Sequence, residues 1–300
     1  MPTNMRVPLF ASPVLLVLSV LFFPHPSTAA VFQLALTPSS RVIAGRVTVR
    51  VAFANHGDEA MQNLRPSIWF DGAWHEGPLV AESLGPGESG NYPLDLGPTP
   101  ALPGAYTAVA AMRYSDRNGH PFTTLQTIPV YTAEPPESAP LTATLAPPAP
   151  RWPVRSARGQ TAKLTLRRRG TLTLILESKS ADPLQAACTL ILPEELAGIQ
   201  TDPMSLEIPP QGAAHHAFQI QNAWAVPGSN YRVFAIVDYV LDGQHASLIV
   251  PGNIELATRR QLSERTVQRL WLIPGTLGLL YLALQFFWKK RDVKSFVVTP

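Results

Sequence analysis

Apolar residues occupy every second position in several short segments in the middle of the chain. In RVTVRVAF, residues 46–53, Val47, Val49, Val51 and Phe53 would share one side of an extended strand, with arginine and threonine on the other. This spacing is typical of a β strand that buries one face. The same alternation recurs in TLTLIL, YTAVAAMRY and YRVFAIVDY. We therefore expect the middle of the chain to fold as half-buried strands.

Proline and glycine interrupt these segments at short intervals. The chain has 31 prolines and 19 glycines among its 300 residues, and helical spacing of apolar residues is almost absent between its two ends. Short alternating strands separated by turn residues are typical of antiparallel β-sandwiches. The predicted fold class is therefore all-β.

The two halves of this middle part resemble each other. Each half contains two prolines seventeen residues apart, followed by a strand, a polar turn and a return strand. The prolines are Pro86 and Pro103 in the first half, and Pro210 and Pro227 in the second. The pairs Asn118-Gly119 and Asp242-Gly243 suit tight hairpin turns. A duplicated fold is expected, at a spacing of about 124 residues.

A proline-rich stretch separates the two halves. It favours extended polyproline geometry, which makes a semi-rigid spacer. We predict one domain at residues 31–134, a linker at 135–140 and a second domain at 141–257, with LTATL as a candidate first strand of the second domain.

An apolar run near the N terminus, residues 14–23, follows Arg6 and precedes the small residues of STAA. This is the layout of a secretory signal peptide, which we predict at residues 1–30. An uncleaved membrane anchor is the alternative, because Pro24 and Pro26 crowd the cleavage region. In either case the chain that follows is expected to be exported.

A second apolar run, residues 270–288, contains no charge. At ~1.5 Å per residue, a helix of this length spans roughly the 30 Å hydrocarbon layer, so it is predicted to be a transmembrane helix. A buried helix of a soluble protein is the alternative, but no other helical segment is predicted for it to pack against. The residues that suit the membrane interface at its two ends are Arg269, Trp271, Trp288, Lys289, Lys290 and Arg291.

Basic residues flank this run equally on both sides, so the positive-inside bias does not orient it. The predicted signal peptide does, because an exported chain that meets a second apolar run leaves residues 289–300 in the cytoplasm. We therefore predict a single-pass protein of the cytoplasmic (inner) membrane with periplasmic or extracellular N-terminal domains. A juxtamembrane segment, residues 258–269, would join them to the bilayer.

Charge is distributed unevenly along the chain. Residues 31–258 hold 15 basic and 19 acidic side chains, whereas residues 259–300 hold 8 and 2. The basic end suits anionic lipid headgroups. In the middle part, only RRRG at Arg167–Gly170 is strongly basic, and such a run is more typical of a solvated strand edge. No nucleic-acid partner is predicted.

Local sequence patterns of catalysis or metal binding are missing. The chain has no nucleophile elbow, no His-Glu-x-x-His pair and no metal-ligand spacing of cysteine and histidine. We predict a non-enzymatic protein with no catalytic residues, no bound metal and no cofactor. Its single cysteine, Cys188, is expected to be a small buried residue rather than a reactive thiol.

The candidate binding residues lie in and beside SIWFDGAWHEG, residues 67–77. If Asp71-Gly72 forms a two-residue turn, Phe70 pairs with Ala73 and Trp69 stands opposite Trp74. One face of the hairpin would then belong to the core, with Leu64, Pro66, Ile68 and Phe70. The other face would carry Arg65, Ser67, Trp69, Trp74 and Glu76.

A flat pair of indoles beside Arg65 and Glu76 would suit stacking on a sugar ring or contact with a partner protein. Three other interpretations stay open. The pair would then only stabilise the hairpin, pack on the other domain, or be turned inward by a β-bulge.

Four short patterns occur in the first half in the order FANHG, IWFDG, LGPGES and PGAY. In this order they resemble the bacterial CARDB-type domains, the cell-adhesion-related immunoglobulin-like modules. The second half, with LILPEELAGIQTDPMSLEIPPQG, is similar to the related NEW3-type β-sandwich, although it has ESKS where NHG would be expected. The resemblance covers about 230 of the 300 residues. It implies two tandem immunoglobulin-like antiparallel β-sandwiches, a non-catalytic role and no family active site.

These features together predict an accessory or scaffolding subunit of the cell envelope. It would present its two domains to a membrane machine, such as a polysaccharide synthase or an exporter. The alternative is a carbohydrate-binding or adhesion module that acts on envelope glycan. A periplasmic chaperone that captures a client strand on a sheet edge, and an enzyme whose site is assembled from dispersed residues, also stay open.

Overall fold

A computed structural model describes residues 32–134, 139–147, 162–166, 168–199 and 203–257. The long regular elements within these ranges are all β strands, so the all-β prediction is confirmed. Among the described residues, no helix is long and apolar enough to span a membrane. The predicted signal peptide, juxtamembrane segment, transmembrane helix and cytoplasmic tail lie outside the described ranges, as does most of the predicted linker.

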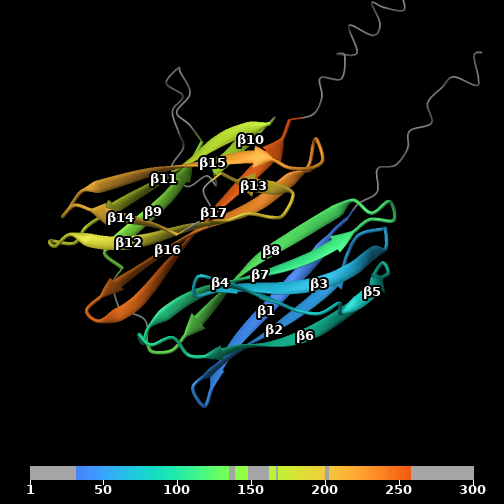
Figure 1. The fold of residues 1–300 in the computed structure, drawn as a ribbon, viewed down its shortest axis with the longest axis horizontal. Helices are drawn as coiled ribbons and strands as arrows, with labels where there is room; N and C mark the ends of the chain where they lie inside the picture. Colours follow the sequence, from blue (N-terminus) through green and yellow to red (C-terminus); the bar gives the residue numbers. More distant parts are fainter. Residues whose placement is uncertain (1–31, 135–138, 148–161, 167, 200–202, 258–300) are drawn as a thin grey trace, which may run out of the picture. The chain divides into compact units, whose positions relative to one another are not determined.

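The described residues form two compact units, the first ending at Ala133 and the second continuing from Glu134. Each unit consists of two β-sheets that enclose one hydrophobic core (Figure 1).

The first unit packs a three-stranded sheet against a five-stranded sheet. The three-stranded sheet has the order β1-β2-β6, with β1 (Leu34–Ile43), β2 (Arg46–Asn55) and β6 (Ser89–Pro98). The five-stranded sheet has the order β4-β3-β7-β8, with β5 paired to β3. Its strands are β3 (Met61–Phe70), β4 (Ala73–Glu76), β5 (Ala81–Leu84), β7 (Ala105–Ser115) and β8 (Pro121–Tyr131).

Alternation in the sequence corresponds to alternation of burial in the first unit. Val47, Val49 and Val51 on β2 are fully buried, and Phe53 nearly so. They face the other sheet, from which β3 and β7 contribute the largest apolar side chains of the same core. The half-buried strand predicted at residues 46–53 is confirmed.

The second unit packs a four-stranded sheet against a five-stranded sheet. The four-stranded sheet has the order β13-β15-β11-β9, with β9 (Leu141–Ala146), β11 (Arg169–Ser178), β13 (Leu196–Gly198) and β15 (Ala213–Asn222). The five-stranded sheet has the order β10-β17-β16-β12-β14. Its strands are β10 (Ala162–Leu166), β12 (Leu184–Ile191), β14 (Met204–Ile208), β16 (Asn230–Leu241) and β17 (Gln244–Leu256). The candidate first strand LTATL lies in β9.

One pair of strands departs from the predicted antiparallel arrangement. β10 pairs with β17 in parallel, whereas the other pairs among the described residues of this unit are antiparallel. β10 ends beside the end of β17, where the backbone N–H of Ala257 donates to the Leu166 carbonyl (2.8 Å).

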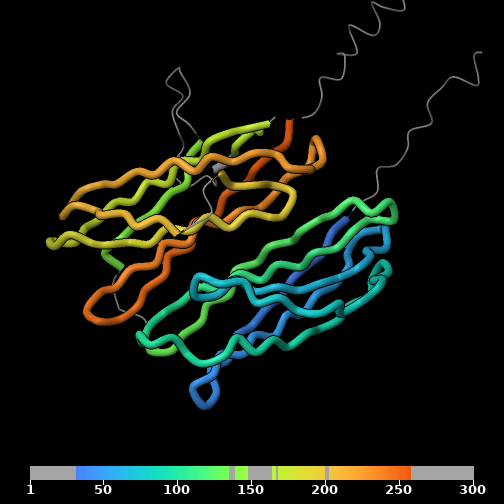
Figure 2. Tube along the Cα trace, in the orientation of Figure 1, coloured from blue at the N-terminus to red at the C-terminus, as the bar shows by residue number. Residues whose placement is uncertain are grey.

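The duplication predicted from the sequence is visible in the order of the strands. β2, β6 and β7 begin at residues 46, 89 and 105, and β11, β15 and β16 begin at 169, 213 and 230, which are offsets of 123, 124 and 125 residues. The neighbours β3-β7-β8 of the first unit correspond to β12-β16-β17 of the second. Figure 2 shows the two units as similar traces. The short strands β5 and β14 also correspond, because they pair with β3 and β12 and begin 123 residues apart, at 81 and 204. The units differ in their other short strands, which are β4 in one and β10 and β13 in the other.

The two predicted tight turns have different outcomes. Asp242 and Gly243 form a two-residue turn between β16 and β17, with φ angles of 51° and 77°. Asn118 and Gly119 instead belong to a five-residue loop between Ser115 and Pro121. The longer loop forms because the Asp116 carboxylate accepts hydrogen bonds from the backbone N–H groups of Asn118 and His120 (both 2.8 Å).

Candidate functional site

The predicted tryptophan hairpin forms in the expected register. Asp71 and Gly72 have φ angles of 47° and 81°, as a two-residue turn of this hand requires. Phe70 pairs with Ala73, and Trp69 pairs with Trp74. The local prediction succeeds because aspartate and glycine both tolerate the left-handed backbone region.

The hairpin faces are also as predicted, but the two indoles differ in exposure. Leu64, Ile68 and Phe70 lie in the core, and Trp69 lies on the opposite face of β3. Trp69 is only 5% exposed, whereas Trp74 is 44% exposed. The structure therefore offers one accessible indole rather than a flat pair.

The charged residues predicted beside the indoles do not act together. Glu76 forms an ion pair with Arg113 of β7, and not with Arg65. Arg65 stands opposite Arg113 in the register of β3 and β7, and is exposed. Arg113 was missed at the sequence level because its place beside Glu76 depends on how β7 is aligned with β3. Arg113 is two residues from Ala111 and four from Val109, and this even spacing is the signal that could have placed it on the same face as these two residues.

The outer face of the five-stranded sheet of the first unit is apolar around Trp69. Val109 is the direct neighbour of Trp69 on β7, and Ala111 pairs with Leu125 of β8. All three are buried, yet none belongs to the core of the unit. We call Trp69, Val109, Ala111 and Leu125 the outer apolar face. Each of these side chains is at most 5% exposed, so the accessible groups of this region are Trp74 and the Glu76–Arg113 ion pair at its edge, which are chemically suited to contact with another protein.

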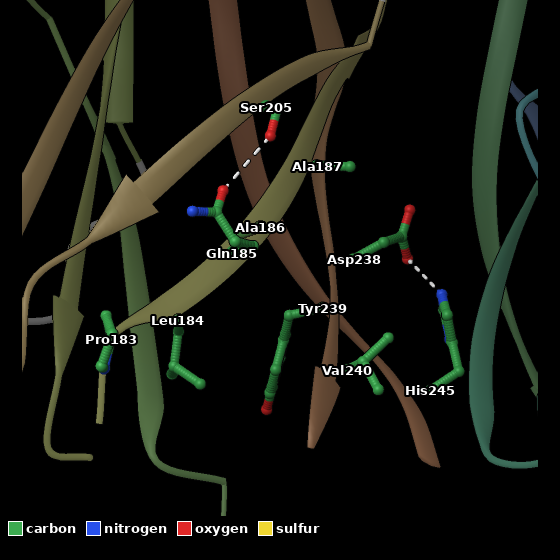
Figure 3. Close-up of a pocket in the computed structure, with 10 residues that line it drawn as sticks. All are labelled: Pro183, Leu184, Gln185, Ala186, Ala187, Ser205, Asp238, Tyr239, Val240 and His245. Carbon is green, nitrogen blue, oxygen red and sulfur yellow. Dashed lines mark hydrogen bonds and ion pairs between the residues drawn. The ribbon is translucent and has the colours of Figure 1, made fainter. Parts of the chain in front are cut away.

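The second unit contains a cavity of about 400 Å³ on the outer face of its five-stranded sheet (Figure 3). Its walls come from β12, β14, β16 and β17. The polar side chains that line it are Gln185, Ser205, Asp238 and His245. Apolar side chains, among them Pro183, Leu184 and Val240, line the rest.

The polar groups of this cavity are not arranged for nucleophilic catalysis. The Ser247 hydroxyl donates directly to Asp238, and Nε2 of His245 lies 3.6 Å from the same carboxylate oxygen. In a catalytic triad the histidine stands between the acid and the nucleophile. Here the aspartate stands between the serine and the histidine. Among the described residues, no three histidine, cysteine or acidic side chains form a metal-binding group either.

Cys188 is fully buried in the core of the second unit, as the sequence predicts. Burial, and to a smaller extent the charge of Asp238, raises the pKa of its thiol to about 12. Because only the thiolate is a good nucleophile, the folded protein keeps this cysteine unreactive.

We expect Cys188 to stay unmodified by a maleimide at pH 8 in the folded protein, and to be modified within minutes in a denaturant. Mass spectrometry of the intact chain measures the modification directly. Rapid modification of the folded chain at pH 8 would contradict the burial of this side chain.

Comparison with known proteins leaves the family open. No family model and no curated protein matches the chain. The chain is similar to the FixG-related protein from Vibrio parahaemolyticus, with 8% identity, a TM-score of 0.29, and coverage of 40% of this chain and 98% of that one. It is also similar to trypsin-activated alpha-2-macroglobulin from Escherichia coli, with 13% identity, a TM-score of 0.30, and coverage of 76% and 18%.

A protein of unknown function from Porphyromonas gingivalis W83 is similar at 12% identity and a TM-score of 0.28, over 75% of this chain and 99% of that one. The resemblance to CARDB-type and NEW3-type domains stays a prediction from the sequence.

Proposed function

We propose that this protein is a non-enzymatic accessory or scaffolding subunit, anchored in the cytoplasmic membrane by one transmembrane helix at residues 270–288. Its two β-sandwich units, which we infer to be immunoglobulin-like, are exported and face away from the cytoplasm. They present a protein-binding surface to an integral membrane partner of the cell envelope, such as a polysaccharide synthase or an exporter.

The observation that carries this proposal is the accessible indole of Trp74, which is 44% exposed at the edge of the outer apolar face of the first unit. Trp74 pairs with the buried Trp69 and lies near the Glu76–Arg113 ion pair, and an exposed tryptophan beside charged groups is typical of protein contacts. The sequence supplies the second argument, because a basic segment and an uncharged apolar run follow the second unit. The partner surface would therefore be held at high local concentration near the membrane.

Trp74 is the side chain of this surface that is best placed to test the proposal. A tryptophan that is a hot spot of an interface commonly contributes about 2 kcal/mol or more, so its loss weakens the affinity for the partner by roughly thirtyfold. We expect the wild-type chain, tagged at its C terminus and isolated from native membranes in mild detergent, to carry a stoichiometric integral membrane protein. Trp74→Ala should lose that protein.

Ile43→Ala is the control for this experiment, because Ile43 is an exposed apolar residue at the end of β1, in the other sheet of the same unit. It should retain the partner. Equal recovery of the partner with Trp74→Ala and with the wild-type chain would exclude the Trp74 surface. Recovery of the wild-type chain alone would exclude the accessory-subunit function.

A carbohydrate-binding role is the second candidate, and the exposed indole of Trp74 beside the Glu76–Arg113 ion pair favours it. An exposed indole is a platform for the apolar face of a sugar ring, and adjacent charged groups bind its hydroxyls. Binding of envelope glycan fragments by the purified chain, lost in Trp74→Ala, would support this function. It would then replace the protein-partner function at the same surface.

A further inference from the structure

The loop Asn222–Ser229, between β15 and β16, is firmly held by hydrogen bonds. The Asn222 side chain accepts from the backbone N–H of Ala225 (2.7 Å) and donates to the Ala225 carbonyl (3.2 Å). The backbone N–H of Trp224 donates to the Glu195 carbonyl (3.2 Å). The loop therefore has a fixed shape, and its residue Ala225 is buried.

This fixed loop exposes its large apolar side chains. Trp224 is 57% exposed, and Val226 is 36% exposed although its backbone N–H is held by the Tyr231 hydroxyl (3.0 Å). Apolar side chains that a hydrogen-bonded loop holds in water have an unfavourable solvation free energy, and these two do not contribute to the core. Tryptophan in such a position is typical of surfaces that meet a membrane interface, where the ring is partly apolar and its N–H stays hydrated.

The loop lies at the end of the second unit from which the chain leaves toward residues 258–300. The backbone N–H of Gly228 donates to the Leu256 carbonyl, and that of Leu256 donates to Ser229 (both 2.9 Å). Figure 2 shows the loop between β15 and β16 beside the red end of β17. The first basic residues of the predicted juxtamembrane segment, Arg259 and Arg260, follow within a few residues.

Basic side chains occupy the same end of the unit. The backbone N–H of Asn222 donates to the carbonyl of Arg168 (2.8 Å), and Arg169 pairs with Gln221 at the start of β11. Both arginine side chains are exposed. Of the acidic residues near them, Glu195 is fully buried, Glu255 is half-buried and Glu194 is exposed. These arginines belong to the RRRG motif, for which the sequence suggested only a solvated strand edge.

We propose that this end of the second unit docks on the surface of an anionic lipid bilayer. Trp224 and Val226 enter the headgroup region, and Arg168 and Arg169 meet anionic headgroups. This inference rests on the proposed membrane anchor, which brings the surface to the bilayer. Exposed basic residues near an anionic membrane each add about 1 kcal/mol, so the arginines and the apolar pair together hold the unit against the lipid.

The test uses the full chain in lipid nanodiscs. A fluorophore is attached at Val226→Cys or, as the matched control, at Ala181→Cys. Ala181 is an exposed residue after the end of β11, so it lies at the opposite end of the unit from Arg169. A strand rises about 3.3 Å per residue, which places the two labels roughly 30 Å apart along β11. Cys188 stays unlabelled because its thiol is buried.

Quenching by lipids that carry a quencher in the headgroup region measures contact. In nanodiscs with anionic lipid, we expect quenching at residue 226 to exceed that at residue 181 severalfold. Arg168→Glu together with Arg169→Glu should reduce the quenching at 226 to the level at 181. With both arginines present, nanodiscs of zwitterionic lipid alone should also reduce the quenching at 226 to that level.

The outcomes separate this inference from the proposed function. A chain that enters the nanodisc but shows equal quenching at 226 and 181 overturns the docking surface and leaves the anchor intact. Quenching at 226 that persists with zwitterionic lipid and after the arginine substitutions overturns the role of anionic headgroups. A chain that does not enter the nanodisc at all overturns the anchor, and the docking surface with it.

Discussion

Asn55→Ala should lower the free energy of unfolding of the first unit by about 2–4 kcal/mol, because three hydrogen bonds to backbone groups are lost at a buried position. Asn55 is fully buried. Its Nδ2 donates to the carbonyls of Glu59 (2.8 Å) and Leu84 (3.0 Å), and its Oδ1 accepts from the backbone N–H of Gly57 (2.9 Å). The side chain thus joins the loop after β2 to the end of β5.

Asn55→Asp should destabilise the unit still more at neutral pH. It keeps the shape of the side chain but turns an oxygen, in place of the donor, toward two carbonyls. A carboxylate at this position would be favoured in its protonated form, so its pKa would rise on folding. The variant should therefore be most stable below the ordinary aspartate pKa and lose stability as the pH rises.

The second unit offers the matched control. Ser178 occupies the position equivalent to Asn55, and its backbone N–H donates to Gly212 (2.8 Å) as that of Asn55 donates to Glu88 (2.9 Å). Among the residues that the structure describes, its hydroxyl accepts one bond, from the backbone N–H of Ser180 (3.1 Å). Ser178→Ala should cost about 1 kcal/mol, in the second unit alone. Hydrogen exchange of β2 and β11 in the full chain, followed in urea, measures each unit separately. Equal losses from Asn55→Ala and Ser178→Ala would contradict the account.

The second large effect is expected at Gly90, which pairs with Phe53 across β2 and β6. A Cβ atom added at Gly90 would lie 2.5 Å from Cζ and 2.7 Å from Cε2 of the Phe53 ring. The ring is buried in the core and cannot move aside without disturbing it. Gly90→Ala should therefore cost about 1–3 kcal/mol in the first unit, and Gly90→Val more.

A double-mutant cycle tests the cause of this effect. In the Phe53→Ala background the ring is gone, so Gly90→Ala should add almost nothing to the loss of stability. The two single substitutions would then be non-additive by about the cost of the clash, roughly 1–3 kcal/mol. Additive losses, measured by the same hydrogen-exchange experiment, would show that the ring does not restrict residue 90.

Local features of the sequence predicted much of the fold. The alternation at residues 46–53 predicted β2 and its buried face, because side chains of a strand point to opposite sides in turn. Asp71-Gly72 and Asp242-Gly243 predicted two-residue turns, because both residues tolerate positive φ. Asn118-Gly119 predicted the wrong loop length, because the Asp116 side chain is an equally local partner that stabilises a wider turn.

Features that depend on alignment between strands could not be predicted in the same way. The alternation of side chains along the strand placed Trp69 on the outer face of β3. The burial of Trp69, however, depends on what surrounds it in three dimensions. The ion pair of Glu76 with Arg113 requires the register of β3 and β7, which shifts between Gln62 and Arg65. The Trp224 loop was not singled out, although a tryptophan between Asn222 and Pro227 in a turn-like segment is a visible signal of an exposed aromatic residue.

The proposed topology is a single-pass anchor with both β-sandwich units on the far side of the cytoplasmic membrane. Thiol accessibility in intact bacterial spheroplasts tests it most directly, with Ala181→Cys in the second unit, Ser295→Cys in the predicted tail, and the wild-type chain as baseline. We expect an impermeant maleimide to label residue 181 at once and residue 295 only after permeabilisation, and the chain to stay in the membrane after an alkaline wash. Equal labelling of both residues in intact spheroplasts, or release of the chain by the wash, would contradict it.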